Sequence, residues 1–323
     1  MQNTPSSPGP SAAQAAFPAP AWLPGLLAGE RAALARAITA VENETPEARA
    51  VLRAIRDRLG RALVVGFTGA PGAGKSTLVS AYVAELRRRS LSVGVVAVDP
   101  SSPLTGGAIL GDRIRMSQHA ADPGVFIRSL ASRGHLGGLS RTAARVIDVF
   151  DASGRDIVVV ETVGTGQSEV EIAEIADVRV VVNAPGLGDD IQAIKAGILE
   201  IADVLVVNKS DLPFAERSAR QLAAMAAQRD GRPVPVLRTS ATRNEGVPDL
   251  ADAIAALGRR KRPDPRARLR RLLAGLAQDW FRRRLEALPA EALDALALDL
   301  LEGNADTDTV LNNLLQLLSR ESR

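Results

Sequence analysis

The fold of this chain is decided by the stretch Gly69-Ala70-Pro71-Gly72-Ala73-Gly74-Lys75-Ser76-Thr77. It satisfies the phosphate-loop pattern G-x-x-x-x-G-K-[ST]. The apolar run at residues 62–68 is suited to a buried strand, and residues 78–86 carry apolar side chains at helical spacing. The motif therefore lies at a strand-to-helix turn, which is the context that the pattern requires.

The chemistry of such a loop depends on backbone amides at a helix N-terminus, where unpaired N–H groups and the helix dipole favour a polyphosphate. Glycine lets the chain wrap closely around the ligand. We expect Lys75 to bridge the β- and γ-phosphates and the hydroxyl of Ser76 to bind Mg²⁺. The alternative is a glycine-rich turn that matches the pattern by chance.

Composition limits the classes of protein that fit. The 323 residues are 46% hydrophobic, which is enough for a packed core in one large or two modest domains. The chain contains no cysteine and two histidines, His119 and His135, so a disulfide or a thiolate metal site is excluded. Lack of cysteine is compatible with a reducing cytosol.

Charge and hydropathy exclude two further classes. The net charge is +3, and lysine occurs only at Lys75, Lys195, Lys209 and Lys261. Such a surface does not predict binding to nucleic acid. No apolar stretch reaches the roughly 18 residues of a membrane span, and the start of the chain lacks the features of a signal peptide. We therefore expect a soluble, cytoplasmic protein without a membrane partner.

The chain divides into four predicted parts. Residues 1–20 are rich in Pro, Ser and Ala and are expected to form a disordered tail, followed by an N-terminal helical extension at 21–60. The extension is expected to hold two helices, with Pro46 at the start of the second. A P-loop domain at 61–260 precedes a leucine-rich helical arm at 261–323. Because its apolar stripes are wide, we expect the arm to pair between two subunits, and docking on its own domain is the alternative.

Strands and helices alternate through the central part. Further strands are predicted at 92–98, 155–164, 178–183, 203–207 and 234–241. This alternation predicts an α/β fold with a mostly parallel, doubly wound sheet. Ligands bind at the carboxyl ends of the strands in such sheets.

Three carboxylates are candidate metal residues and, together with Lys75, candidate catalytic residues. Asp99 and Glu161 each end a predicted strand, and Asp112 follows a glycine-rich segment. With Ser76 they form the predicted magnesium site, and the amide of Gly164 is expected to meet the γ-phosphate. Taken singly, Asp99 and Asp112 are equally compatible with helix caps.

The base specificity is predicted by Asn208, Lys209 and Asp211, which form the pattern N-K-x-D after a strand. The carboxylate of Asp211 can accept two hydrogen bonds from guanine, whereas adenine offers no such donor pair. An unpaired buried polar group costs about 1–3 kcal/mol, so the pattern favours GTP over ATP. Ser240 and Ala241 end the last predicted strand, where a backbone amide could meet the guanine oxygen. Without the phosphate loop, each segment would be an ordinary strand end.

A second glycine-rich loop, at residues 184–195, leads into a helix. It carries Asp189, Gln192 and Lys195, which we expect to couple the nucleotide to a partner protein. The alternative is that these residues only cap and solvate the following helix.

In order, these motifs resemble the MeaB/ArgK-type P-loop GTPases, which are G-protein chaperones of adenosylcobalamin-dependent acyl-CoA mutases such as methylmalonyl-CoA mutase. The most specific elements are D-P-S-S-P at 99–103 and E-T-V-G-x-G-Q-S-E at 161–169, and the resemblance spans about residues 25–320. It implies a GTP-hydrolysing homodimer that uses GTP/GDP and Mg²⁺. It also implies a role in loading, exchange and protection of the cobalamin cofactor on a mutase.

The sequence departs from the family pattern at residues 128–135, which we expect to form a loop facing the partner. Three other functions are each compatible with only part of the sequence. A nickel-delivery maturation GTPase would need Cys and His ligands. A small-molecule kinase conflicts with N-K-x-D, and a purely structural dimerisation module conflicts with the intact nucleotide motifs.

Overall fold

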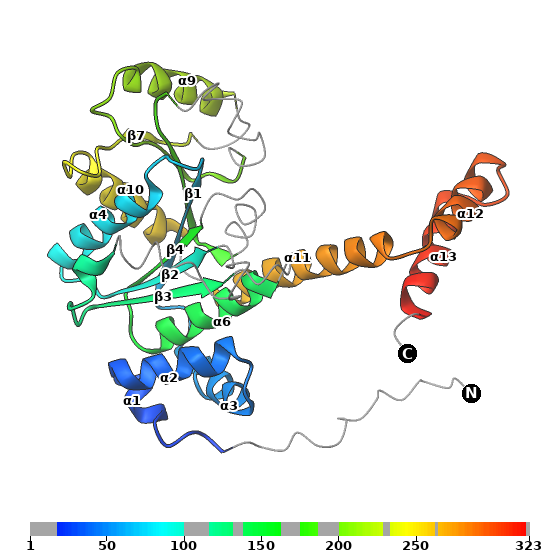
Figure 1. The fold of residues 1–323 in the computed structure, drawn as a ribbon, viewed down its shortest axis with the longest axis horizontal. Helices are drawn as coiled ribbons and strands as arrows, with labels where there is room; N and C mark the ends of the chain where they lie inside the picture. Colours follow the sequence, from blue (N-terminus) through cyan, green and yellow to red (C-terminus); the bar gives the residue numbers. More distant parts are fainter. Residues whose placement is uncertain are drawn as a thin grey trace.

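The computed structural model describes residues 18–99, 116–131, 138–162, 175–186, 200–228, 233–261 and 264–320. Its centre is a seven-stranded sheet in the order β3-β2-β4-β1-β5-β6-β7, and all neighbouring strands are parallel (Figure 1). The strands are β1 Leu63–Gly69, β2 Val93–Asp99, β3 Val125–Ala131, β4 Ile157–Thr162, β5 Val178–Asn183, β6 Val204–Val207 and β7 Val236–Arg238. The predicted doubly wound α/β fold is confirmed.

Helices cover both faces of this sheet (Figure 1). On one face α4 and α10 pack against β1, β2, β5 and β6; on the other, α6 packs under β2 and β4, and α9 packs under β5 and β6. The helices are α1 Leu23–Leu27, α2 Arg31–Glu42, α3 Pro46–Ala54, α4 Lys75–Arg88, α6 Gly138–Ala152, α9 Ala215–Ala227, α10 Val247–Lys261, α11 Pro265–Glu286, α12 Ala290–Leu301 and α13 Thr307–Arg320. Two short 3-10 turns are η1 Arg56–Arg58 and η2 Ser117–His119.

Burial on both faces explains the composition of the central strands. In β1 and β4 nearly every residue is buried, and side chains alternate between the two helical layers. Val65 packs against α4, whereas Val64 packs toward α6. Strands covered on both faces therefore appear in the sequence as continuous Val and Ile runs rather than as alternating patterns.

The N-terminal extension contains three helices and not the two that were predicted. The short α1 precedes the predicted pair, and α3 begins at Pro46 as expected. These helices pack on α6, and their apolar side chains belong to the buried cluster that α6 forms with β2 and β4. Arg31 also holds them to the edge of the sheet, because its Nη1 donates to the carbonyl of Val125 at 3.0 Å and its guanidinium lies 5.1 Å from the ring centre of Phe126.

The prediction of a partner-facing loop at 128–135 is wrong for its first half. Residues 128–131 lie inside β3, in register with residues 96–99 of β2. Arg128 pairs with Glu42 of α2, so its side chain is used within the chain. Residues 132–135 lie outside the described ranges.

The C-terminal helices differ from the rest of the molecule. Figure 1 shows α11 running away from the sheet, with α12 and α13 at its far end. Arg284 joins two of these helices, since its Nη1 donates to the carbonyl of Leu318 at 2.8 Å. Leu273 and Leu301 remain 64% and 84% exposed. No helix within the described ranges is long and apolar enough to cross a membrane.

Candidate functional site

The phosphate loop closes the gap between the end of β1 and the start of α4. Gly69 and Gly74 both have positive φ, at 136° and 83°. A Cβ at Gly69 would lie 2.0 Å from the carbonyl oxygen of Val182, and a Cβ at Gly74 would lie 2.6 Å from Nδ2 of Asn208. Glycine is thus required at both positions by the backbone conformation, and also by the close approach of the β5 backbone at Gly69 and of the Asn208 side chain at Gly74.

The loop brings two polar side chains to the start of α4. Nζ of Lys75 donates to the carbonyls of Gly69 and Ala70 at 2.7 and 3.0 Å. The hydroxyl of Ser76 donates to Oε1 of Glu161 at 2.6 Å, and both side chains are buried. Glu161 lies on β4, which neighbours β1 in the sheet. The sheet order therefore joins two predicted site residues that are 85 positions apart.

Oxygen ligands of this kind fit the cation that the motif implies. Mg²⁺ prefers hard oxygen donors and is commonly held by one or two carboxylates together with substrate phosphates. Ser76 and Glu161 supply a hydroxyl and a carboxylate in direct contact. Among the described residues, no group of three or more His, Cys, Asp or Glu side chains is placed to hold a metal ion.

Asn208 links the phosphate loop to the base-recognition segments. Its Nδ2 donates to the carbonyls of Ala73 at 3.0 Å and Gly74 at 3.3 Å. Its Oδ1 accepts hydrogen bonds from the hydroxyl of Thr239 at 3.1 Å and from the amide of Ala241 at 3.2 Å. An amide side chain has two N–H donors and two acceptor sites, so these four contacts use its full capacity. In this arrangement Asn208 positions both loops relative to each other.

Lys209 and Asp211 complete the predicted pattern. Lys209 adopts the left-handed conformation with φ 55°, and its Nζ donates to the carbonyl of Gly72 at 2.8 Å. Oδ1 of Asp211 accepts a hydrogen bond from the hydroxyl of Ser240 at 2.7 Å. The lysine therefore extends along the phosphate loop while the carboxylate is held at the neighbouring strand end.

The hydroxyl of Ser240 lowers the pKa of Asp211 below its ordinary value, and the positive charges of Arg243 and Lys209 act in the same direction. Oδ2 of Asp211 lies 3.7 Å from the guanidinium of Arg243, and the side chain is 19% exposed. A carboxylate with a lowered pKa stays ionised at neutral pH and accepts hydrogen bonds without donating any.

The sequence predicts a role for the backbone of Ser240 and none for Thr239. The structure shows that both hydroxyls act on the N-K-x-D residues, Ser240 on Asp211 and Thr239 on Asn208. The detectable signal is a pair of hydroxyl residues at the end of a strand. Their use depends on β6 and β7 being neighbours, which the sequence does not reveal.

Several predicted site residues lie wholly or partly outside the described ranges. The backbone of Asp99 ends β2, at the same edge of the sheet as Glu161, but its side chain is outside the description. The other residues outside the described ranges are Asp112, Gly164, Asp189, Gln192 and Lys195.

A phosphate loop on a parallel sheet, joined through Asn208 to a guanine-type recognition segment, defines a P-loop GTPase. Comparison with known proteins agrees, since residues 34–271 match the family model described as methylmalonyl-CoA mutase-associated GTPase MeaB. The match covers most of the chain, which therefore belongs to the MeaB family. The predicted resemblance and the predicted GTPase activity are confirmed.

Individual relatives extend this assignment. A Pyrococcus horikoshii protein is 42% identical and covers 89% of this chain and 95% of its own length. GTPase ArgK of Escherichia coli is 49% identical over 57% of this chain and 56% of its own length. The mitochondrial methylmalonic aciduria type A homolog of Mus musculus is 37% identical over 71% of this chain and 60% of its own length.

The fold is also similar to a solved structure. The crystal structure of a protein described as LAO/AO transport system kinase is 29% identical, with a TM-score of 0.65. The similarity covers 92% of this chain and 96% of that one. It therefore includes the C-terminal helices as well as the sheet.

Proposed function

We propose that this GTPase is a chaperone that assists the loading, exchange and protection of adenosylcobalamin on an acyl-CoA mutase. The observation that carries the proposal is membership in a family of methylmalonyl-CoA mutase-associated GTPases. The matched residues 34–271 include all of the predicted nucleotide-binding residues. The relative from Mus musculus, whose description refers to methylmalonic aciduria type A, supports an acyl-CoA mutase as the partner.

The phosphate side of the site would act through charge and position. Lys75 would exchange its contacts with the loop carbonyls for the β- and γ-phosphates, and the loop amides would hold the remaining phosphate oxygens. Mg²⁺ would be held by Ser76 together with the predicted Asp99, Asp112 and Glu161. When bound, the cation neutralises negative charge on the phosphates.

The base side would select guanine. The ionised carboxylate of Asp211 would accept hydrogen bonds from the two donors on the guanine edge, and the hydroxyl of Ser240 holds Oδ1 and lowers the pKa of the carboxyl. Asn208 would align the loops rather than serve mainly as a base contact, because its four hydrogen-bonding positions are all used by the protein. Adenine has no such donor pair, so it would lose the hydrogen bonds that guanine makes to this charged group.

The functional unit would be a homodimer formed by α11, α12 and α13. These helices expose large apolar side chains, among them Trp280 at 41%, Leu298 at 54% and Leu301 at 84%. Exposed apolar patches of this kind mark protein interfaces. The second copy would cover them and leave the nucleotide site on each sheet accessible.

Phosphate release by the full chain tests this function in two steps. GTP and ATP are first compared, and hydrolysis of GTP alone is expected. The cognate mutase is then added, and we expect hydrolysis to accelerate at least tenfold, since partners of GTPases order the catalytic residues. Equal use of ATP would favour the kinase alternative. GTP hydrolysis without acceleration, and without co-purification of the two proteins, would contradict the chaperone role and leave the GTPase assignment intact.

The nickel-delivery alternative has a different requirement. Nickel sites use Cys, His or other nitrogen and sulfur ligands, and this chain has no cysteine and two histidines. Titration with Ni²⁺ separates the two functions, because a maturation GTPase would bind the ion stoichiometrically.

A further inference from the structure

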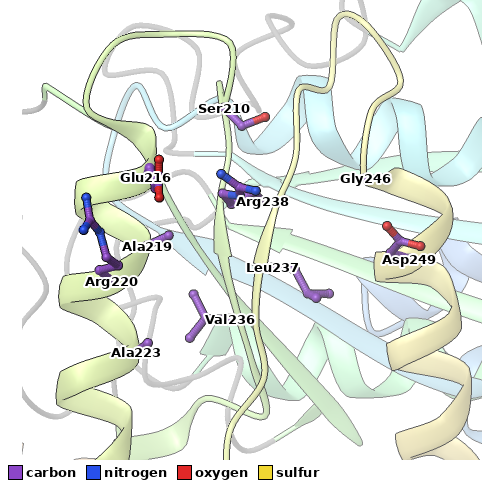
Figure 2. Close-up of a pocket in the computed structure, with 10 residues that line it drawn as sticks. All are labelled: Ser210, Glu216, Ala219, Arg220, Ala223, Val236, Leu237, Arg238, Gly246 and Asp249. Atoms are coloured by element: carbon purple, nitrogen blue, oxygen red, sulfur yellow. The ribbon is translucent and has the colours of Figure 1, made fainter.

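The turn between β7 and α10 brings a charged side chain to the base-recognition segments. In Figure 2 this connection leaves β7 after Arg238 and reaches Gly246 just before α10. A Cβ at Gly246 would lie 2.1 Å from the carbonyl oxygen of Arg238, so the two ends of the turn lie against each other. The turn is therefore a short, closed unit.

Backbone hydrogen bonds fix the shape of this turn. The amide of Ser240 donates to the carbonyl of Glu245 at 3.0 Å, and the amide of Glu245 donates back to the carbonyl of Ser240 at 3.1 Å. The amide of Arg243 donates to the same carbonyl of Ser240, also at 3.1 Å. Asn244 adopts the left-handed conformation with φ 56°, which asparagine tolerates better than most residues. The backbone of Arg243 therefore has a defined position next to Ser240.

The side chain of Arg243 lies beside Asp211. Its Nη2 is 3.7 Å from Oδ2 of Asp211. This separation is an ion pair that is too long for a hydrogen bond, so Oδ2 keeps its capacity to accept one. Oδ1 of the same carboxylate accepts a hydrogen bond from the hydroxyl of Ser240 at 2.7 Å. The two oxygens of Asp211 thus have different neighbours, a hydroxyl at Oδ1 and a guanidinium at Oδ2.

Two other charged residues belong to the same segments. Lys209 also acts on Asp211 through its charge, but its Nζ donates to the carbonyl of Gly72 on the phosphate loop. Glu245 is exposed, and its backbone groups close the turn. Of these three charged side chains, Arg243 is the one that lies against Oδ2.

A guanine bound to Asp211 would present its oxygen, its N1–H and its exocyclic amine in that order along one edge. The oxygen is expected at Ser240 and Ala241, so the adjacent N1–H would fall nearest to Oδ1 and the amine would fall on Oδ2. A carboxylate has about four lone-pair sites, which is enough for the serine hydroxyl, the guanidinium and both donors of the base. Arg243 therefore need not leave when guanine binds.

We propose that Arg243 is a positioning residue for guanine recognition, because its guanidinium holds Oδ2 of Asp211 where that oxygen accepts a hydrogen bond from the exocyclic amine. The inference rests on the proposed binding of guanine to Asp211. It assigns to the turn after β7 a part in discriminating guanine from hypoxanthine. Hypoxanthine has the same oxygen and N1–H but lacks the amine.

The test compares the dissociation constants of GDP and inosine diphosphate for the full-length protein at low salt. Arg243→Gln removes the charge, Arg243→Lys retains it, and Thr242→Ala is the matched control because Thr242 is an exposed neighbour in the same turn. Since exposed ion pairs contribute modestly, we expect Arg243→Gln to weaken GDP binding by about threefold and to leave inosine diphosphate nearly unchanged. Arg243→Lys should keep most of the preference for GDP, and the control should keep all of it.

Salt separates an electrostatic role from a structural one. The side chain of Arg243 is 59% exposed, so the effect of Arg243→Gln should disappear at about 1 M salt, where the Debye length is about 3 Å. A change in the shape of the turn would not respond to salt in this way. Equal weakening of both nucleotides, unchanged GDP binding, or a difference that persists in high salt would overturn the proposal.

Asp211→Asn distinguishes failure of the inference from failure of the base site. If Asp211→Asn keeps the preference for GDP over inosine diphosphate, the proposed base site is contradicted and the role of Arg243 falls with it. If Asp211→Asn loses the preference and Arg243→Gln keeps it, the base site stands and the role of Arg243 is overturned.

Discussion

Val65 in β1 is fully buried, whereas Leu301 in α12 has 84% of its surface exposed. The same contrast holds between the sheet with its covering helices and the three C-terminal helices. In the first region apolar side chains from strands and helices meet in continuous clusters. In the second region large apolar side chains remain at the surface.

The contrast shows that the two regions obtain their stability differently. Burying a leucine contributes about 1.5–3 kcal/mol relative to leaving it exposed, and the sheet domain obtains this contribution within one chain. The C-terminal helices would obtain it from a second chain. Nucleotide chemistry and subunit association should therefore respond to separate substitutions.

The largest effect is expected in the phosphate loop. Lys75→Ala or Ser76→Ala should reduce GTP hydrolysis by roughly 10²–10³-fold or more, because both side chains would act on the developing phosphate charge. Neither side chain belongs to an apolar cluster. The unfolding temperature and the oligomeric mass in solution should therefore match those of the wild type. Phosphate release and calorimetry check this. Unchanged turnover in either variant would remove the phosphate-loop assignment.

The next effect concerns base choice. Asp211→Asn should weaken GTP binding by about 10–100-fold, since a hydrogen bond to a charged group contributes ~1.5–3 kcal/mol. It should strengthen binding of xanthosine triphosphate, whose O2 accepts from the new amide. Isothermal titration with both nucleotides measures the exchange. Retained preference for guanine would contradict the role of Asp211.

Substitutions in the C-terminal helices should change self-association and leave GTP hydrolysis unchanged. Leu301→Ser is expected to weaken self-association by about tenfold or more, which corresponds to the loss of one buried leucine. Hydrolysis of GTP should not change. Leu212→Ser is the matched control, because Leu212 is exposed on the sheet domain at 44%. Sedimentation over a range of concentrations measures the dissociation constant of self-association. A value for Leu301→Ser equal to that of the wild type and of Leu212→Ser would contradict the dimer proposal.

A smaller effect is expected on the acceleration of GTP hydrolysis by the partner mutase. Gln192→Ala and Lys195→Ala should leave GTP affinity and basal hydrolysis nearly unchanged and reduce the acceleration by the mutase several-fold. The reason is that a partner protein can order a glycine-rich segment such as the one predicted at residues 184–195. Full stimulation of both variants in steady-state assays would place the coupling elsewhere.

The smallest effect is a pH dependence within the base site. The hydroxyl of Ser240 lowers the pKa of Asp211, so Ser240→Ala should raise the pKa of this carboxyl back toward its ordinary value. Binding needs the ionised form, and the loss of GDP affinity on acidification should therefore begin at a higher pH in the variant. In an acid titration, the midpoint of the affinity loss is expected at a higher pH for the variant than for the wild type. Ser210→Ala is the control, and parallel curves for all three proteins would contradict the assignment.

The strands that the sequence predicts correctly are those that helices cover on both faces of the sheet. The strands β1, β2, β4, β5 and β6 appear in the sequence as Val-rich runs because helices cover both of their faces. The strand β3 was missed, since it lies at the edge of the sheet and includes Arg128 and Ser129. Its arginine is accommodated by Glu42 of the N-terminal helices, a contact between residues 86 positions apart.

Within the site, the sequence predicted the residue types but not their partners. N-K-x-D identified Asn208 as a base-recognition residue, yet its hydrogen bonds to Ala73 and Gly74 join segments about 135 positions apart. The contact of Ser76 with Glu161 likewise depends on β4 lying beside β1. Local pattern carries no information about which strands are neighbours.

The sequence by itself determined the phosphate loop, the guanine-recognition pattern, the parallel α/β class and the leucine-rich helices at the end of the chain. Each of these depends on residue type and short-range spacing, which act through backbone conformation and hydrophobic periodicity. Only the tertiary structure decided the order of the strands, the linkage of both loops through Asn208 and the position of Arg243 beside Asp211. These features depend on hydrogen bonds and packing between distant segments, whose free energy is obtained only when the whole sheet has formed.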